Sequence, residues 1–194
     1  MTYTVHTEET APEAARPFLD GAKKKFGFVP NLLGTMADAP ALLKGYLTLA
    51  EIFDSTSFSP TERQIVLLAT SRANRCAYCM AAHTAIAGMQ KVPEDVVKAL
   101  RDNTPINDPK LEALRAFASD VAEKRGYPSE DILKKFLSAG YTKSQVLEVV
   151  LGVGFKTLSN YTNHIANTQL DQAFTPVAWN EKTEHASCKT HCCG

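Results

Sequence analysis

The sequence of 194 residues has little that would direct it to a polyanion or a membrane. Lysine and arginine total 21 and aspartate and glutamate total 21, so no net charge concentrates nucleic acid or anionic lipid. No apolar run approaches the roughly 18 residues of a membrane span. Residues 1–12 have neither the basic region nor the apolar core of a signal peptide. We expect a cytoplasmic protein that binds neither nucleic acid nor membrane.

Signals of β-structure are also missing. No pair of alternating runs is joined by turn chemistry, and there is no βαβ rhythm. Apolar residues instead recur at helical spacing, and 44% hydrophobic content over this length is enough for one core. The sequence therefore predicts an all-α fold, with a single domain over residues 1–180 and a tail rich in Cys and His over residues 181–194.

Proline, glycine and capping residues mark the expected helices. Ser59 to Glu62 and Thr142 to Gln145 both have the pattern of a capping box, which predicts helix starts at Pro60 and just after Thr142. Residues 27–31 break the first helix and begin a linker packed onto the body. The expected helices cover residues 12–26, 40–53, 60–73, 76–90, 93–100, 109–124, 129–137 and 142 onward.

One short stretch has residue types and spacing that specify chemistry. Cys76 and Cys79 are separated by two residues, and His83 follows Cys79 by four, on the same helical face. The helix start, the cation Arg75 and the base His83 would each favour a thiolate. Because His83 lies closer to Cys79, we expect Cys79 to be the activated thiol and Cys76 to resolve its oxidised form as a disulfide.

Four other interpretations of the cysteine pair remain open at this point. A thioredoxin-like site needs a βαβ setting, and covalent haem attachment needs histidine where Met80 stands. A zinc site is a stronger alternative, since two Cys and one His make three ligands, but no second internal Cys pair completes a structural site. Two buried structural cysteines are the remaining alternative.

Residues 62–69, then 74–79 and His83, resemble the carboxymuconolactone decarboxylase family, specifically its alkylhydroperoxidase D-like branch. The resemblance implies an all-helical oligomer, a trimer or hexamer. It also implies that Cys79 attacks a hydroperoxide, Cys76 resolves it, His83 belongs to a proton relay and an external dithiol reduces the disulfide. No cofactor is implied. The decarboxylase branch generally lacks the Cys pair, so its reaction is disfavoured.

The sequence departs from the family pattern at one catalytic position. Gln64 stands where the family has its relay glutamate, and an amide cannot carry a proton as an acid. Glu62 is a second candidate, but it points about 200° away around the helix and suits the capping box better. Glu148 is an acid from elsewhere that would serve as a substitute. A third hypothesis is a family member that has kept the fold and lost the chemistry.

The last ten residues hold three Cys and two His. Such a composition suits a soft metal ion or a thiol arm that exchanges with the internal disulfide. The alternative function is therefore a non-enzymatic metal or metalloid binding protein, with ligands Cys188, His191, Cys192 and Cys193. Before the tail, Phe174 and Trp179 are expected to anchor the chain onto the body or onto a neighbouring subunit.

Overall fold

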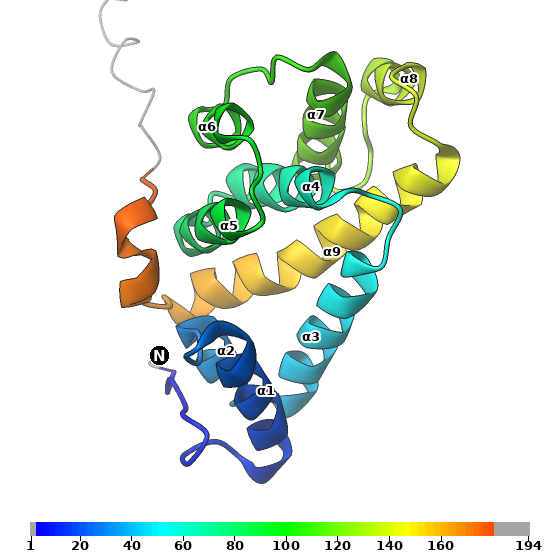
Figure 1. Ribbon diagram of the computed structural model, residues 1–194. Coiled ribbons are helices and arrows are strands. Elements are labelled where there is room, and N and C mark those ends of the chain that lie inside the picture. The colour runs from blue at the N-terminus through cyan, green and yellow to red at the C-terminus, as the bar shows by residue number, and fades with distance from the viewer. Residues whose placement is uncertain (1–2, 181–194) are drawn as a thin grey trace, which may run out of the picture.

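The computed structural model describes residues 3–180, and within them the chain is helical and has no strand (Figure 1). The predicted all-α fold is confirmed. The α-helices are α1 (Arg16–Phe26), α2 (Asn31–Met36), α3 (Pro40–Asp54), α4 (Pro60–Ala73), α5 (Ala77–Met89), α6 (Glu94–Asp102), α7 (Pro109–Glu123), α8 (Glu130–Ser138) and α9 (Lys143–Ala166), with the 3-10 helices η1 (Glu13–Ala15) and η2 (Gln172–Val177).

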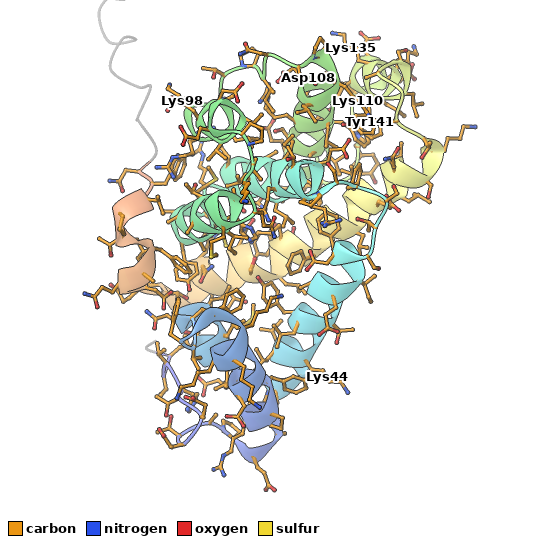
Figure 2. All side chains as sticks on the ribbon, viewed as in Figure 1. Lys44, Lys98, Asp108, Lys110, Lys135 and Tyr141 are labelled. Atoms are coloured by element: carbon orange, nitrogen blue, oxygen red, sulfur yellow. The ribbon has the colours of Figure 1, made fainter. Side chains whose placement is uncertain are left out.

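Helix α4 is the centre of the fold. It packs against α5, α6, α7 and α9, and its residues 64–71 are all buried. Figure 1 shows α9, the longest helix, crossing the molecule between α4 and the layer formed by α1 to α3. Side chains fill the space between these layers (Figure 2). A helix that is surrounded by protein needs apolar residues on nearly every side, which is what the sequence pattern of α4 predicts.

Both predicted capping boxes are present. Ser59 Oγ accepts a hydrogen bond from Glu62 N at 3.2 Å, and Glu62 Oε2 accepts one from Ser59 N at 2.9 Å. Thr142 and Gln145 make the same reciprocal pair at 3.2 and 2.9 Å. These bonds satisfy backbone N–H groups that have no partner within the helix, and so fix the starts of α4 and α9.

Helix α2 was not predicted, since residues 27–33 read as a linker. Gly27, at a φ of 82°, ends α1 as expected, but a short helix then begins at Asn31. Its first N–H groups are held by distant residues: Asn31 N donates to Asp171 Oδ1 at 3.0 Å, and Leu32 N donates to Tyr78 Oη at 3.2 Å. The helix thus depends on tertiary contacts that no local pattern reveals.

The segment after α9 is anchored as the sequence predicted. Phe174 and Trp179 are buried, and Trp179 Nε1 donates to the carbonyl oxygen of Arg101 at 3.1 Å. The Arg101 guanidinium in turn donates to the carbonyl oxygens of Val177 and Ala178 at 3.0 and 2.9 Å. None of the helices in residues 3–180 is long and apolar enough to cross a bilayer. The proposed metal ligands of the tail lie outside the described residues.

Gly152 marks a close approach of α9 to its neighbours. A methyl group at this position would lie 2.7 Å from both Phe53 and Val66, which are themselves buried. We expect Gly152→Ala to lower the free energy of unfolding by about 1–3 kcal/mol, because neither neighbour has room to move. Gly45→Ala in α3 is the matched control: its methyl group meets nothing, so helix propensity should raise stability by up to about 1 kcal/mol. Chemical denaturation measures both, and equal effects would contradict this packing argument.

Candidate active site

The two cysteines lie at the junction of α4 and α5. Cys76 is the N-cap of α5 and Cys79 lies in its first turn, as the sequence predicted. Both are buried free thiols, and Asn163 Nδ2 from α9 donates to both, at 3.2 Å to Cys79 Sγ and 3.7 Å to Cys76 Sγ. One amide therefore bridges the pair and holds the two sulfur atoms beside one another.

The two thiols differ in acidity. The hydrogen bond that Cys76 donates to Cys79, together with burial, raises the pKa of Cys76. Burial alone would raise the pKa of Cys79 as well, but the hydrogen bond from Cys76 and the positive charge of Lys156 bring it well below the usual thiol value. Cys79 is thus the thiolate and Cys76 the thiol that stabilises it.

The thiols also differ in access. A cavity of about 490 Å³ is lined by Cys79, His83 and Lys156, and the rest of its wall is largely apolar. Of the two described thiols, only Cys79 lines this cavity. A molecule that enters the cavity therefore meets the more acidic sulfur first, with Cys76 behind it.

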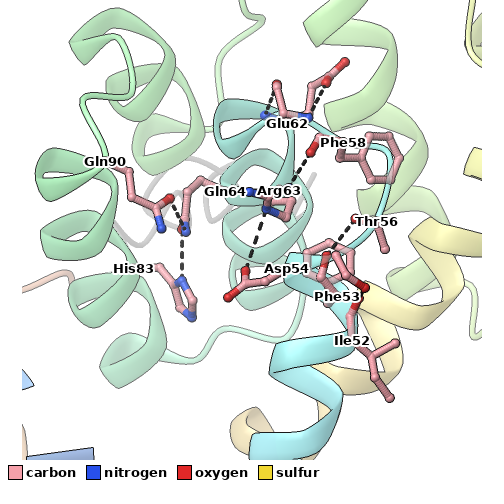
Figure 3. Close-up of polar contacts among 12 residues, drawn as sticks. Ile52, Phe53, Asp54, Thr56, Phe58, Glu62, Arg63, Gln64, His83 and Gln90 are labelled. Atoms are coloured by element: carbon pink, nitrogen blue, oxygen red, sulfur yellow. Dashed lines mark hydrogen bonds and ion pairs between the residues drawn. The ribbon is translucent and has the colours of Figure 1, made fainter. Parts of the chain in front are cut away.

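His83 is held by a chain of side-chain amides (Figure 3). Gln64 Nε2 donates to Gln90 Oε1 at 3.1 Å, which turns Gln64 Oε1 toward His83 Nδ1 at 3.0 Å. An amide oxygen only accepts, so Nδ1 carries the proton and Nε2 keeps its lone pair. Burial and the charge of Lys156 lower the pKa of His83 well below its usual range. His83 is a neutral imidazole with a free acceptor nitrogen.

The structure places the two acidic candidates elsewhere. Glu62 is engaged in its capping box and lies 3.7 Å from Lys110 Nζ, and Figure 3 shows it turned away from His83. Glu148 accepts hydrogen bonds from Ser57 N and Oγ, at 3.3 and 2.6 Å, near the start of α9. The eleven-residue separation between Glu148 and Ser159, which contacts Cys79, amounts to about 16 Å along a helix. Neither carboxylate takes the place of the relay glutamate.

Sequence reasoning missed a polar face on α9. Lys156, Ser159, Asn160 and Asn163 follow one another at the i, i+3, i+4, i+7 spacing of one helical face, and all four are buried. Ser159 Oγ lies 3.7 Å from Cys79 Sγ. Polar residues at this spacing within a largely apolar helix could have predicted a polar site opposite α9, because a buried polar face needs hydrogen-bond partners.

Lys156 is the most unusual member of this face. Its side chain is 1% exposed, and among the ion pairs of residues 3–180 none joins Lys156 to a carboxylate. Burial would lower its pKa, but the negative charge of Cys79 raises it above the usual lysine value. An ammonium group in such a place requires an anion, and the Cys79 thiolate supplies it. The cation of the site is therefore Lys156, whereas Arg75 is exposed.

The structure does not support zinc at the cysteine pair, and two further side chains near the site have other surroundings. No group of three or more His, Cys, Asp or Glu side chains within residues 3–180 is placed to hold a metal ion, which disfavours zinc at Cys76, Cys79 and His83. His164 on α9 is exposed and stacks on Tyr161. Tyr78, between the two cysteines, is buried and donates to Asp171 Oδ2 at 2.5 Å, so it ties the motif to the segment after α9.

The neutral state of His83 makes stability depend on pH. Folding favours the uncharged ring, so this contribution is fully present above the unfolded-state pKa of about 6.5 and is lost as the pH falls below it. We expect the free energy of unfolding to fall by up to about 1.4 kcal/mol per pH unit from this group. His83→Gln should reduce the difference between pH 7.5 and 5.5 in denaturant titrations under reducing conditions, and the lowered pKa of Cys79 accounts for what remains. His164→Gln is the control and should leave that difference intact; an unchanged pH dependence in His83→Gln would refute the argument.

The described residues thus form a helical domain with two buried thiols at a helix start, one of which, Cys79, lines a cavity. Residues 40–120 match the model of the carboxymuconolactone decarboxylase family. This match agrees with the resemblance drawn from the sequence. No curated protein matches the sequence.

Solved structures share the fold over nearly the whole chain. The alkylhydroperoxidase AhpD core of an uncharacterized peroxidase-related protein from Ralstonia eutropha JMP134 has 24% identity and a TM-score of 0.78, covering 89% of this chain and 93% of its own. The debrominase Bmp8, as a Cys-to-Ala variant in complex with 2,3,4-tribromopyrrole, has 21% identity and a TM-score of 0.75, covering 90% and 94%. A peroxidase-related protein from Silicibacter sp. TM1040 has 18% identity and a TM-score of 0.73, covering 84% and 87%.

Proposed function

We propose that this protein is a thiol-dependent hydroperoxide reductase. The observation that carries the proposal is the asymmetry of the pair: Cys79 lines the cavity and has the lowered pKa, whereas Cys76 is protonated behind it. Such an arrangement suits a nucleophile with a resolving thiol. The family and the fold support a peroxidase-related enzyme.

The reaction has three steps. The Cys79 thiolate attacks the terminal oxygen of a hydroperoxide, the O–O bond breaks, and Cys79 becomes a sulfenic acid while an alcohol leaves. Cys76 then attacks the Cys79 sulfur, which forms the disulfide and releases water. An external dithiol exchanges with the disulfide and restores both thiols. His83 offers its free Nε2 as the acceptor that orients the hydroperoxide O–H group.

Peroxide titration of the reduced protein, followed by mass mapping of all five cysteines, tests the proposal. We expect one equivalent of hydroperoxide to join Cys76 to Cys79, and a dithiol to reverse the change. Because the debrominase Bmp8 shares the fold, 2,3,4-tribromopyrrole is included as a second compound. Oxidation that spares Cys79 would sink the assignment.

The alternative function concerns the tail, which lies outside the described residues. A metal or metalloid binder would use Cys188, His191, Cys192 and Cys193 as ligands, with the helical body as an assembly scaffold. Elemental analysis of the purified protein separates the two functions. Stoichiometric metal that disappears when residues 187–194 are deleted would favour the binder.

We also propose that the protein is a homo-oligomer, a trimer or hexamer. The exposed apolar residues of α9 support this: Leu147, Val150, Tyr161 and Ile165 are 51–70% exposed and recur along one helix. Large apolar side chains that are exposed along one helix are typical of a face that another subunit covers. Light scattering after size exclusion counts the subunits, and a monomer at all concentrations would contradict the proposal.

A further inference from the structure

The proposed reaction needs a proton that the site must supply. When the O–O bond breaks, the leaving oxygen departs as an alkoxide, a strong base that is poorly expelled without an acid. The family's relay glutamate is absent here, and Gln64 carries no acidic proton. The only N–H of neutral His83 is committed to Gln64 Oε1. The Tyr78 hydroxyl is committed to Asp171.

Lys156 is a protonated group that faces the same cavity. It comes from α9, three residues before Ser159, which contacts Cys79, and seven before Asn163, which binds both sulfur atoms. Its ammonium group holds three protons, and within residues 3–180 it has no carboxylate partner to keep them. Position and charge thus put an acid beside the nucleophile.

The chemistry itself would trigger the transfer. In the reduced site, the negative charge of Cys79 balances the buried charge of Lys156. Formation of the S–O bond removes that negative charge and leaves a buried ammonium without an anion, which strongly favours loss of a proton. At the same moment the alkoxide gains the negative charge that Cys79 has lost. The acid therefore becomes strongest when the proton is needed.

We propose that Lys156 is the general acid of this site, a catalytic residue that donates a proton to the departing oxygen of the hydroperoxide. The proposal rests on the proposed hydroperoxide reductase activity. The step balances: thiolate, hydroperoxide and ammonium give sulfenic acid, alcohol and neutral amine. Disulfide formation then releases water, and Lys156 regains its proton from solvent when the external dithiol restores the Cys79 thiolate.

Tyr46 is the other proton-bearing side chain to compare with Lys156. It lines the cavity and is buried, and burial raises the pKa of its phenol. The remaining titratable residues of the cavity wall, Lys25, Glu51 and Asp54, are exposed. Tyr46→Phe is therefore the matched variant for the experiment.

The experiment compares two oxidants that differ in their need for an acid. tert-Butyl hydroperoxide expels a basic alkoxide, whereas peracetic acid expels a stable carboxylate that needs no proton. Single-turnover oxidation of Cys79 is measured with each, and alkylation by iodoacetamide reports the thiolate alone. Both oxidation rates depend equally on the fraction of Cys79 that is thiolate. Their ratio is therefore independent of that fraction and reports only the contribution of the general acid.

Lys156→Arg keeps the charge but cannot act as an acid. We expect it to retain iodoacetamide and peracetic acid reactivity within about tenfold and to lose tert-butyl hydroperoxide reactivity by roughly 10²–10⁴-fold. Lys156→Met should slow all three reactions. Its rate with tert-butyl hydroperoxide relative to peracetic acid should fall by the same factor as in Lys156→Arg, so the test holds even if arginine does not fit. Tyr46→Phe should change the ratio less than about tenfold.

Each outcome decides the matter. An unchanged ratio in both Lys156 variants would overturn the proposal and leave the proton to His83 or solvent. If instead Tyr46→Phe lowered the rate with tert-butyl hydroperoxide relative to the rate with peracetic acid, the general acid would be Tyr46. A parent protein that is alkylated readily but reacts with neither peroxide would refute the reductase function itself, while the alkylation rates would still report whether Lys156 sustains the thiolate.

Discussion

Replacement of Cys79 by serine should lower the rate of hydroperoxide reduction by at least about 10⁴-fold, because the nucleophile is removed outright. Cys79 is the sulfur that lines the cavity, and its pKa is lowered by the hydrogen bond from Cys76 and the charge of Lys156. A serine hydroxyl in the same place stays protonated and does not attack the O–O bond. Steady-state peroxide consumption with a dithiol reductant measures the loss.

Cys76→Ser is the matched control for this prediction. Its hydroxyl still donates to the Cys79 sulfur, so the first attack should survive while the disulfide cannot form. We expect one equivalent of peroxide to be consumed and a sulfenic acid to accumulate on Cys79, detected by dimedone labelling and mass mapping. If Cys76→Ser lost the first attack and Cys79→Ser kept it, the two roles would be exchanged.

Replacement of His83 by phenylalanine should lower the rate of peroxide oxidation by about 10²-fold or more. The ring presents Nε2 as an acceptor only because Gln64 fixes the proton on Nδ1, and phenylalanine preserves the volume without the acceptor. Iodoacetamide alkylation of Cys79 should change far less, since that reaction has no hydroperoxide O–H group to orient. Stopped-flow oxidation and alkylation rates at pH 7 give both numbers.

Two further variants, Gln64→Leu and His164→Phe, are compared with His83→Phe. Gln64→Leu removes the hydrogen bond that fixes the proton on His83 Nδ1. It should lower the oxidation rate less than loss of the imidazole ring does. His164 is exposed on α9, so its replacement should leave the oxidation rate unchanged. Should His83→Phe oxidise as fast as the parent protein, His83 has no part in the chemistry and its interaction with Gln64 is structural.

The sequence by itself determined most of the helices, the dithiol and its candidate base. Capping boxes and prolines are local signals, so the starts of α4 and α9 were predicted correctly. The i to i+4 relation of Cys79 and His83 follows from helical geometry alone. The short helix α2 escaped prediction, because its N–H groups depend on Asp171 and Tyr78, far away in the sequence.

Only the tertiary structure decided which charges reach the thiols. The sequence suggested Arg75, which precedes Cys76 directly, whereas the cation beside Cys79 is Lys156, brought there from α9. The sequence left Glu62 and Glu148 open as acids, and packing committed them to Ser59 and Ser57. Electrostatic interactions depend on distance and burial, and these are set by how α4, α5 and α9 pack, not by position along the chain.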